Sequence, residues 1–184
     1  MDLDIPLLGS YQPENAAIAF AAIRDLIRMG IRISGDAIMA GFRETSWPGR
    51  MQIVRSNPTV IVDGTHNAPG VPALAASLRE LFPGEKFVFV LGILDDKDLK
   101  AFADPLGPLT SRLVIAKPET HRAYPPSEIA RAFAGYVSDP LLVPKVSEAV
   151  DRAIELAGPD RIVVVTGSIY TAGEALAHLK GRQG

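Results

Sequence analysis

Runs of consecutive apolar residues alternate with helical patterns from residue 51 onward. The runs at 60–62, 87–91 and 162–165 are apolar throughout, which is typical of strands whose two faces are both covered. Segments with apolar residues at helical spacing separate them. Because parallel neighbours need crossover connections, this alternation predicts an α/β fold with a doubly wound, mostly parallel sheet.

The predicted elements can be placed by residue number. We expect strands at 51–55, 59–63, 86–91, 112–116, 141–143 and 161–166. We expect helices at 70–82, 97–104, 127–136, 147–157 and 170–179, with Ser127 capping the third of them. The turn signal Ser56-Asn57-Pro58 between the first two strands predicts one antiparallel strand at the edge of the sheet.

The first fifty residues have a different pattern, with helices and no strand. A helix is expected over 13–29, with Pro13 in its first turn, and a shorter one that Ser34 caps and Gly41 ends. Both are rich in apolar residues but have no strand partner nearby. We expect residues 10–41 to pack as helices beside the α/β domain and to be the edge of something larger.

Composition narrows the class of protein. The chain has 184 residues, 47% hydrophobic and 22% charged, as in ordinary globular proteins. A net charge of −2 gives no reason to expect nucleic acid or an anionic membrane as partner. No apolar run approaches the roughly 18 residues that span a bilayer, and Asp2 and Asp4 argue against a signal peptide. The absence of Cys excludes disulfides and fits a cytoplasmic location.

Unusual polar residues follow three of the predicted strands, in the segments 63–67, 92–98 and 166–170. The carboxyl ends of parallel strands share one edge of a sheet, so we expect Asp63, His66, Asp95 and Ser168 around one shallow, open cleft. Each segment also has a plainer interpretation. The first is a polar loop before a helix, the second a solvated acidic turn with Asp96 or Asp98 as a cap, and the third a tight turn.

Other motifs are missing or weak. His121 lies in a proline-rich loop and His178 on the last helix, and we interpret both as surface residues. Three scattered histidines without Cys argue against a zinc site. Neither the dinucleotide-binding glycine motif, nor a phosphate-binding loop of the Walker type, nor a nucleophile elbow is present in the sequence.

Four motifs in order resemble a known family: Trp47-Pro48-Gly49-Arg50-Met51-Gln52, Asp63-Gly64-Thr65-His66-Asn67, Leu91-Gly92-Ile93-Leu94-Asp95-Asp96-Lys97-Asp98 and Thr166-Gly167-Ser168-Ile169-Tyr170. Together they are similar to folylpolyglutamate synthase/dihydrofolate synthase, the folate branch of the Mur ligase superfamily. The early segment 8–17 resembles the end of that family's ATPase domain, where a His often stands in place of Tyr11.

This resemblance implies two parts. Residues 1–46 would be a remnant of the central ATPase domain and linker, and 47–184 the Rossmann-like C-terminal domain. The family uses ATP and Mg²⁺ to phosphorylate a folate or dihydropteroate carboxylate, and the amine of L-glutamate then attacks the acyl phosphate. The phosphate-binding loop, the Mg²⁺ ligands and most of the folate pocket would lie in the N-terminal ATPase domain. The chain alone is therefore expected to be inactive.

The resemblance also assigns residues. Arg50, Asp63 and His66 would bind ATP, and no residue of the chain is assigned to the metal. Residues for the acceptor glutamate, or for ordering the loops, would be Lys97, Asp98, Ser168 and Tyr170.

Two alternatives remain open. One is a non-catalytic module that binds a nucleotide or a partner. The other is a different Mur-type amino acid ligase, against which the Asp-Lys-Asp loop and the Trp-Pro-Gly-Arg spacing favour the folate branch.

Overall fold

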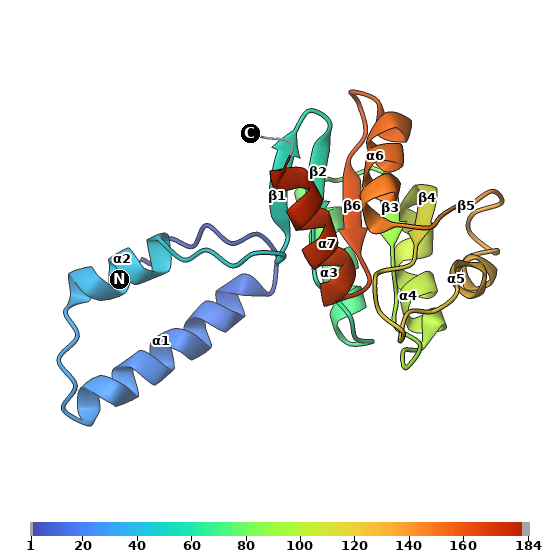
Figure 1. Cartoon of the computed structure of the whole chain (residues 1–184). Coiled ribbons are helices and arrows are strands. Elements are labelled where there is room, and N and C mark those ends of the chain that lie inside the picture. The colour runs from blue at the N-terminus through green and yellow to red at the C-terminus, as the bar shows by residue number, and fades with distance from the viewer. Residues whose placement is uncertain (1, 182–184) are drawn as a thin grey trace.

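A six-stranded sheet with the order β1-β2-β6-β3-β4-β5 forms the centre of the computed structural model, which describes residues 2–181 (Figure 1). All neighbours pair in parallel except β1, which is antiparallel to β2. The predicted α/β, doubly wound sheet with one antiparallel edge strand is confirmed. The strands are β1 (Gln52–Ser56), β2 (Thr59–Val62), β3 (Phe87–Leu91), β4 (Thr110–Ala116), β5 (Leu141–Val143) and β6 (Val163–Thr166).

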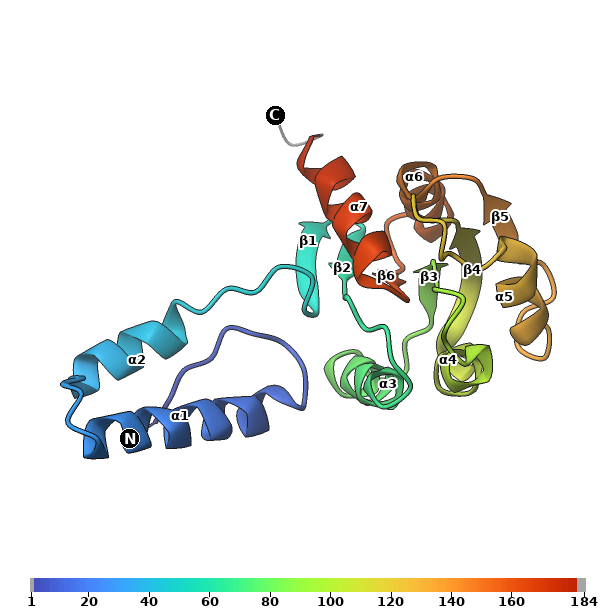
Figure 2. The same ribbon diagram turned by 60° about the horizontal axis from the view of Figure 1, so that its bottom comes forward.

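Helices cover both faces of the sheet (Figure 2). Side chains that alternate along the strands, such as Ile61 and Phe89, enter a core shared with one set of helices, and their neighbours Val60 and Val88 enter a core shared with the other. All four side chains are fully buried, which explains the uninterrupted apolar runs. The first set is α3 (Gly70–Leu81), α4 (Leu99–Leu106) and α5 (Pro126–Ala132); the second is α6 (Val146–Ala157) and α7 (Ile169–Lys180).

Strand β6 lies between β2 and β3, although it comes last in the chain. The connections that leave β2 and β3 run through helices on one face, whereas β6 leads into α7 on the other. Adjacent strands whose connections leave to opposite faces create a crevice at their carboxyl ends, where α/β proteins bind ligands. The carboxyl ends of β2, β6 and β3 therefore form the natural place for a site.

Helices α1 (Gln12–Arg28) and α2 (Gly35–Arg43) project away from the sheet as an arm (Figure 1). The expectation that they pack beside the α/β domain is wrong. Their buried side chains Ala16, Ile38 and Phe42 form a small cluster of their own with the N-terminal segment, instead of joining either core of the sheet. Pro13 lies in the first turn of α1 and Ser34 caps α2, both as predicted.

Two segments connect the arm to the α/β domain. The returning segment leads from α2 into β1. The outgoing segment is also seated on the domain, because Leu8 and Tyr11 pack against the core on the α3 side. The main-chain N–H of Ser10 donates to the hydroxyl of Ser77 over 3.0 Å, and Ser77 is fully buried in α3. Residues before the expected boundary at 46/47 thus contact the sheet-covering helices directly.

Some predicted helix ends are wrong. Ser127 does not cap α5, because the helix begins at Pro126 and its cap residue, Pro125, has no side-chain hydrogen bond. The helix also ends at Ala132 rather than at 136. Beyond it the chain turns so that the ring of Tyr136 covers Gly107, at a distance that leaves no room for a Cβ atom there. Tertiary packing has thus overridden the helical pattern.

No helix in residues 2–181 combines the length and apolar character that crossing a bilayer requires.

Candidate functional site

A tight turn at the start of β1 carries Arg50. Gly49 and Met51 on either side of it have positive φ values of 70° and 46°, and Met51 is buried. Left-handed backbone is uncommon for a residue other than glycine and persists only where neighbouring groups hold it. Here the carbonyl of Gly49 accepts the N–H of Gly64 over 2.7 Å, which ties the turn to the segment after β2.

Asp63 is buried completely, although we expected it around a shallow, open cleft. Its Oδ2 accepts the N–H of Met51 and its Oδ1 the N–H of Thr65, each over 2.9 Å. The pleat explains the burial, since Asp63 follows the same face of β2 as Ile61, which points into the core. The carboxylate thus holds the turn that bears Arg50 in place.

His66 and Arg50 line one pocket at the carboxyl end of β2. The His66 side chain is exposed, and its Nδ1 lies 2.9 Å from the carbonyl oxygen of Gly64. The pocket has a volume of about 190 Å³ and is also lined by Ile169 and Leu176 of α7. Arg50 also borders a larger pocket of about 500 Å³ between the two segments that connect the arm. Its guanidinium therefore stands between two open spaces.

The four residues expected around one cleft share the predicted edge of the sheet but not a common cavity. They follow β2, β3 and β6, which run parallel, so the shared edge is confirmed. Asp95 is exposed but does not line the pocket of Arg50 and His66, and Ser168 is fully buried. The expectation of a single cleft is wrong, because Asp63 and Ser168 are fully buried and hold their loops in place through hydrogen bonds.

Ser168 caps α7, with its Oγ accepting the N–H of Thr171 over 3.0 Å. The hydroxyl of Thr171 in turn donates to the carbonyl of Gly92 over 2.9 Å, which joins the loop after β6 to the loop after β3. Asp98 likewise caps α4 by accepting the N–H of Lys100. Tyr170 lies next to the Ser168 cap and is exposed.

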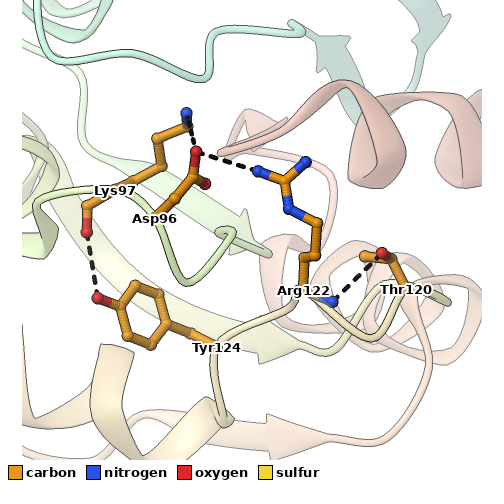
Figure 3. Close-up of polar contacts among 5 residues, drawn as sticks. All are labelled: Asp96, Lys97, Thr120, Arg122 and Tyr124. Carbon is orange, nitrogen blue, oxygen red and sulfur yellow. Dashed lines mark hydrogen bonds and ion pairs between the residues drawn. The ribbon is translucent and has the colours of Figure 1, made fainter.

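A group of charged side chains joins the loops that follow β3 and β4 (Figure 3). One oxygen of Asp96 pairs with Lys97 over 2.7 Å and with Arg122 over 3.1 Å. The hydrogen bond from Lys97 is the main reason that the pKa of Asp96 lies below its usual value. The hydroxyl of Tyr124 donates to the carbonyl of Lys97, as Figure 3 also shows. Two cations thus share one carboxylate, and the loops are held together.

Sequence reasoning missed several of these residues. Arg122 and Tyr124 lie in the proline-rich loop, where no periodic pattern indicates a partner, and main-chain bonds to Ile93 and Asp95 place them. Tyr11 was noted only as a departure from the family's usual His. Of the other histidines, His121 is exposed as predicted, while His178 is half-buried and pairs with Asp151 over 2.9 Å.

In residues 2–181 no group of three or more His, Cys, Asp or Glu side chains is arranged to hold a metal ion. The Asp63 carboxylate, which holds the turn that bears Arg50, already uses both oxygens for main-chain N–H groups. The part of the site in this chain therefore offers cations and hydrogen-bond donors, which suit an anionic ligand better than a metal.

The model of the Mur ligase, glutamate ligase domain matches residues 49–169, from the Arg50 turn to the start of α7. The chain belongs to this family. The match covers all six strands, so the family domain coincides with the sheet described above. The arm of α1 and α2 lies outside it.

Three similar proteins extend the comparison. The probable bifunctional folylpolyglutamate synthase/dihydropteroate synthase of Halobacterium salinarum is 36% identical over 94% of this chain and 20% of that protein. Mycobacterium tuberculosis folylpolyglutamate synthase, solved with ADP and AMPPCP, is 33% identical with a TM-score of 0.87, covering 97% of this chain and 42% of the other. The bifunctional folylpolyglutamate synthase/dihydrofolate synthase of Yersinia pestis, solved with AMPPNP and a Mn ion, is 26% identical with a TM-score of 0.81, over 98% of this chain and 41% of that one.

The arm is included in these similarities, since they reach beyond residues 49–169 to nearly the whole chain. This chain matches the C-terminal portion of the folylpolyglutamate synthases. It spans about a fifth to two fifths of their length.

Proposed function

We propose that this chain is the C-terminal part of an ATP-dependent ligase that adds L-glutamate to a folate or dihydropteroate through an acyl phosphate. The observation that carries the proposal is the convergence of Arg50 and His66 on one pocket at the carboxyl end of β2. A guanidinium suits phosphate oxygens, and an imidazole beside it donates or accepts a hydrogen bond. The proposal keeps the cytoplasmic location expected from the sequence.

Within this proposal, Arg50 and His66 contact ATP directly. Asp63 acts on the nucleotide through the turn, because its two oxygens are taken by main-chain N–H groups and it has no exposed surface. On the other side of the edge, Lys97 offers a cation for a carboxylate of L-glutamate, while Ser168 and Asp98 hold the neighbouring loops as helix caps. Tyr170 is exposed next to Ser168, and in this proposal it would contact the acceptor.

The proposal also assigns the arm. Residues 1–46 would close an ATPase domain that carries the phosphate-binding loop and the Mg²⁺ ligands. Large apolar side chains on both helices of the arm support this role, since Ile18 in α1 is 65% exposed, Met29 at the end of α1 is 79% exposed and Met39 in α2 is 39% exposed. Apolar side chains that face solvent on two adjacent helices are typical of a surface that another part of a protein covers. Mg²⁺ would neutralise phosphate charge, and Arg50 would add to that effect from this side.

An activity assay tests the proposal. The chain alone, supplied with ATP, Mg²⁺, L-glutamate and a dihydropteroate or tetrahydrofolate acceptor, should form no product, whereas the ligase that contains it should. Calorimetric titration of the chain with ADP should give weak binding that Arg50→Gln abolishes and Arg112→Gln, an exposed control on β4, leaves unchanged. Product from the chain alone would refute the proposed division of roles. Tight ADP binding together with an inactive full-length protein would favour a non-catalytic module.

A further inference from the structure

Trp47 lines the pocket of Arg50 and His66, and its indole belongs to no core of the fold. The side chain is 64% exposed, and in residues 2–181 it joins none of the three apolar clusters. Large aromatic side chains usually bury most of their surface on folding. The indole of Trp47 thus offers free aromatic surface beside the two residues proposed to contact the nucleotide.

Helix α7 supplies an apolar wall to the same pocket. Ile169, Ala172 and Leu176 line it, and Ile169 is 59% exposed. The turn that carries Trp47 lies directly against this wall. A Cβ atom on Gly49 in that turn would be 3.8 Å from the Ala172 Cβ and from the Leu176 Cδ1. The indole and the α7 side chains therefore border one common space of about 190 Å³.

Gly173 leaves α7 bare at this pocket, although the surrounding packing would admit a side chain. Its main chain is ordinary helix without a positive φ. Among residues 2–181, no atom beyond its chain neighbours and the main chain of its own helix lies within 4 Å of the place that a Cβ would take. Glycine inside a helix costs stability relative to Ala, and no close contact explains it here. At Gly92, by contrast, a Cβ would lie 2.4 Å from the Thr171 hydroxyl. The missing side chain of Gly173 therefore keeps pocket space open.

The lining of the pocket selects one kind of ligand group. An aromatic side chain, an apolar wall and a bare stretch of helix suit a flat ring that stacks and loses water on binding. Arg50 and His66 in the same lining suit an anionic group attached to that ring. A purine base that carries phosphates has both parts.

We infer that this pocket is the subsite for the purine base of the nucleotide, where Trp47 stacks on the base and Gly173 leaves room for it. The inference rests on the proposed function in one respect, that the nucleotide is ATP. The aromatic surface, the apolar wall and the bare stretch of α7 are properties of this chain alone.

The first test uses the fluorescence of Trp47, which is the only tryptophan of the chain and therefore reports on this pocket alone. We expect ADP to quench the fluorescence, and adenosine to quench it to the same end value at higher concentration, because both carry the base. Inorganic tripolyphosphate should displace ADP without quenching, because it has phosphates only. ADP that binds in a calorimetric titration but leaves the fluorescence unchanged would overturn the inference.

The second test compares two helical glycines. Gly173 and Gly41 are both exposed and both have open space where a Cβ would lie, but only Gly173 lines this pocket. Gly173→Ala and Gly41→Ala should each raise Tm by about 2 °C, because Ala favours the helix. Only Gly173→Ala should raise the Kd for ADP, by about 10-fold, while the Kd for tripolyphosphate stays the same. A variant that is more stable and yet binds ADP more weakly has lost pocket space and not folding. Unchanged ADP binding in Gly173→Ala would overturn the inference.

The third test varies the aromatic ring. Trp47→Ala should raise the Kd for ADP about 10-fold, typical of losing one stacked ring, and Trp47→Phe should restore most of the affinity because its ring also stacks. Equal losses in Trp47→Phe and Trp47→Ala would contradict stacking. Displacement of adenosine from the pocket by a dihydropteroate but not by ADP would assign the pocket to another ring and overturn the inference.

Arg50→Gln separates this inference from the proposed function. If ADP binding depends on Arg50 but not on Trp47 or Gly173, the base subsite is wrong and the proposed function stands. If adenosine still quenches Trp47 while Arg50→Gln leaves ADP binding unchanged, the base subsite stands and the proposed role of Arg50 fails. If neither ADP nor adenosine binds, both are wrong.

Discussion

The carboxylate of Asp63 accepts the main-chain N–H of Met51 over 2.9 Å, across twelve residues of sequence. Met51 has a φ of 46° and is buried, so this bond fixes a conformation that an ordinary residue rarely adopts. Arg50 is its immediate neighbour. The direction in which the Arg50 side chain leaves the main chain is thus set by a buried carboxylate.

Replacing Asp63 should therefore affect stability. Asp63→Ala leaves the N–H groups of Met51 and Thr65 buried without partners, and each such loss costs about 1–3 kcal/mol. We expect the free energy of unfolding in urea to fall by about 3 kcal/mol. The matched control, Asp95→Ala, removes an exposed carboxylate from the same edge of the sheet and should change it by less than about 0.5 kcal/mol. Similar stability of both variants would contradict the role given to Asp63.

His66→Ala should affect catalysis and leave stability intact. The side chain is exposed, so its removal creates no cavity. In the ligase that contains the chain, we expect kcat/KM to fall by about 10²-fold, typical of losing a positioned polar group. His121→Ala, on an exposed loop away from the pocket, is the control for kcat/KM, and thermal unfolding of both variants should match wild type. Unchanged kcat/KM in His66→Ala would remove His66 from the site.

Lys97 should matter for the acceptor amino acid and not for the nucleotide. Lys97→Met keeps the length of the side chain but removes the cation that Asp96 holds at the edge of the sheet. We expect KM for L-glutamate to rise about 10-fold, since a charge-assisted contact is lost, while KM for ATP stays the same. Lys100→Met, an exposed lysine in α4, is the matched control. A rise in KM for ATP alone would indicate that Lys97 contacts the nucleotide and not the acceptor amino acid.

The phenol of Tyr11 should lose its proton only at unusually high pH. Its pKa of about 12 lies above the ordinary value of 10, chiefly through burial. In the difference between wild-type and Tyr11→Phe absorbance at 295 nm, phenolate should appear only as pH passes through about 12. Because the folded-state pKa is raised, the linked stability is fully present below pH 10 and is lost as pH rises toward 12. A midpoint near 10 would contradict the burial of the hydroxyl.

The sheet was predictable from the sequence because each buried strand is a continuous apolar run, and two covered faces leave few other folds. The edge that carries the polar segments followed from the same argument. Ser34 was predicted as a helix cap, and Asp98 was one of two candidates for a cap, since a cap depends on residues within one turn.

Relations between distant segments were not predictable in the same way. The burial of Asp63 depends on main-chain N–H groups presented by the turn at Met51, and nothing in the pattern around Asp63 indicates them. The pairing of Arg122 with Asp96 depends on a bridge between two loops. The bond from Ser10 to Ser77 joins residues that are 67 positions apart in the sequence. Such contacts require the folded backbone before any side chain can be placed.

The double attachment of the arm has a mechanical consequence. Two segments connect the arm to the α/β domain: the outgoing one at Leu8 and Tyr11, and the returning one that leads to Arg50. A pocket of about 500 Å³ lies between them. Two connecting segments that lie apart resist rotation of the arm about its long axis. They still allow the arm to bend about the line that joins their two points of attachment. We therefore expect movement of the arm to be mainly a bend about that line.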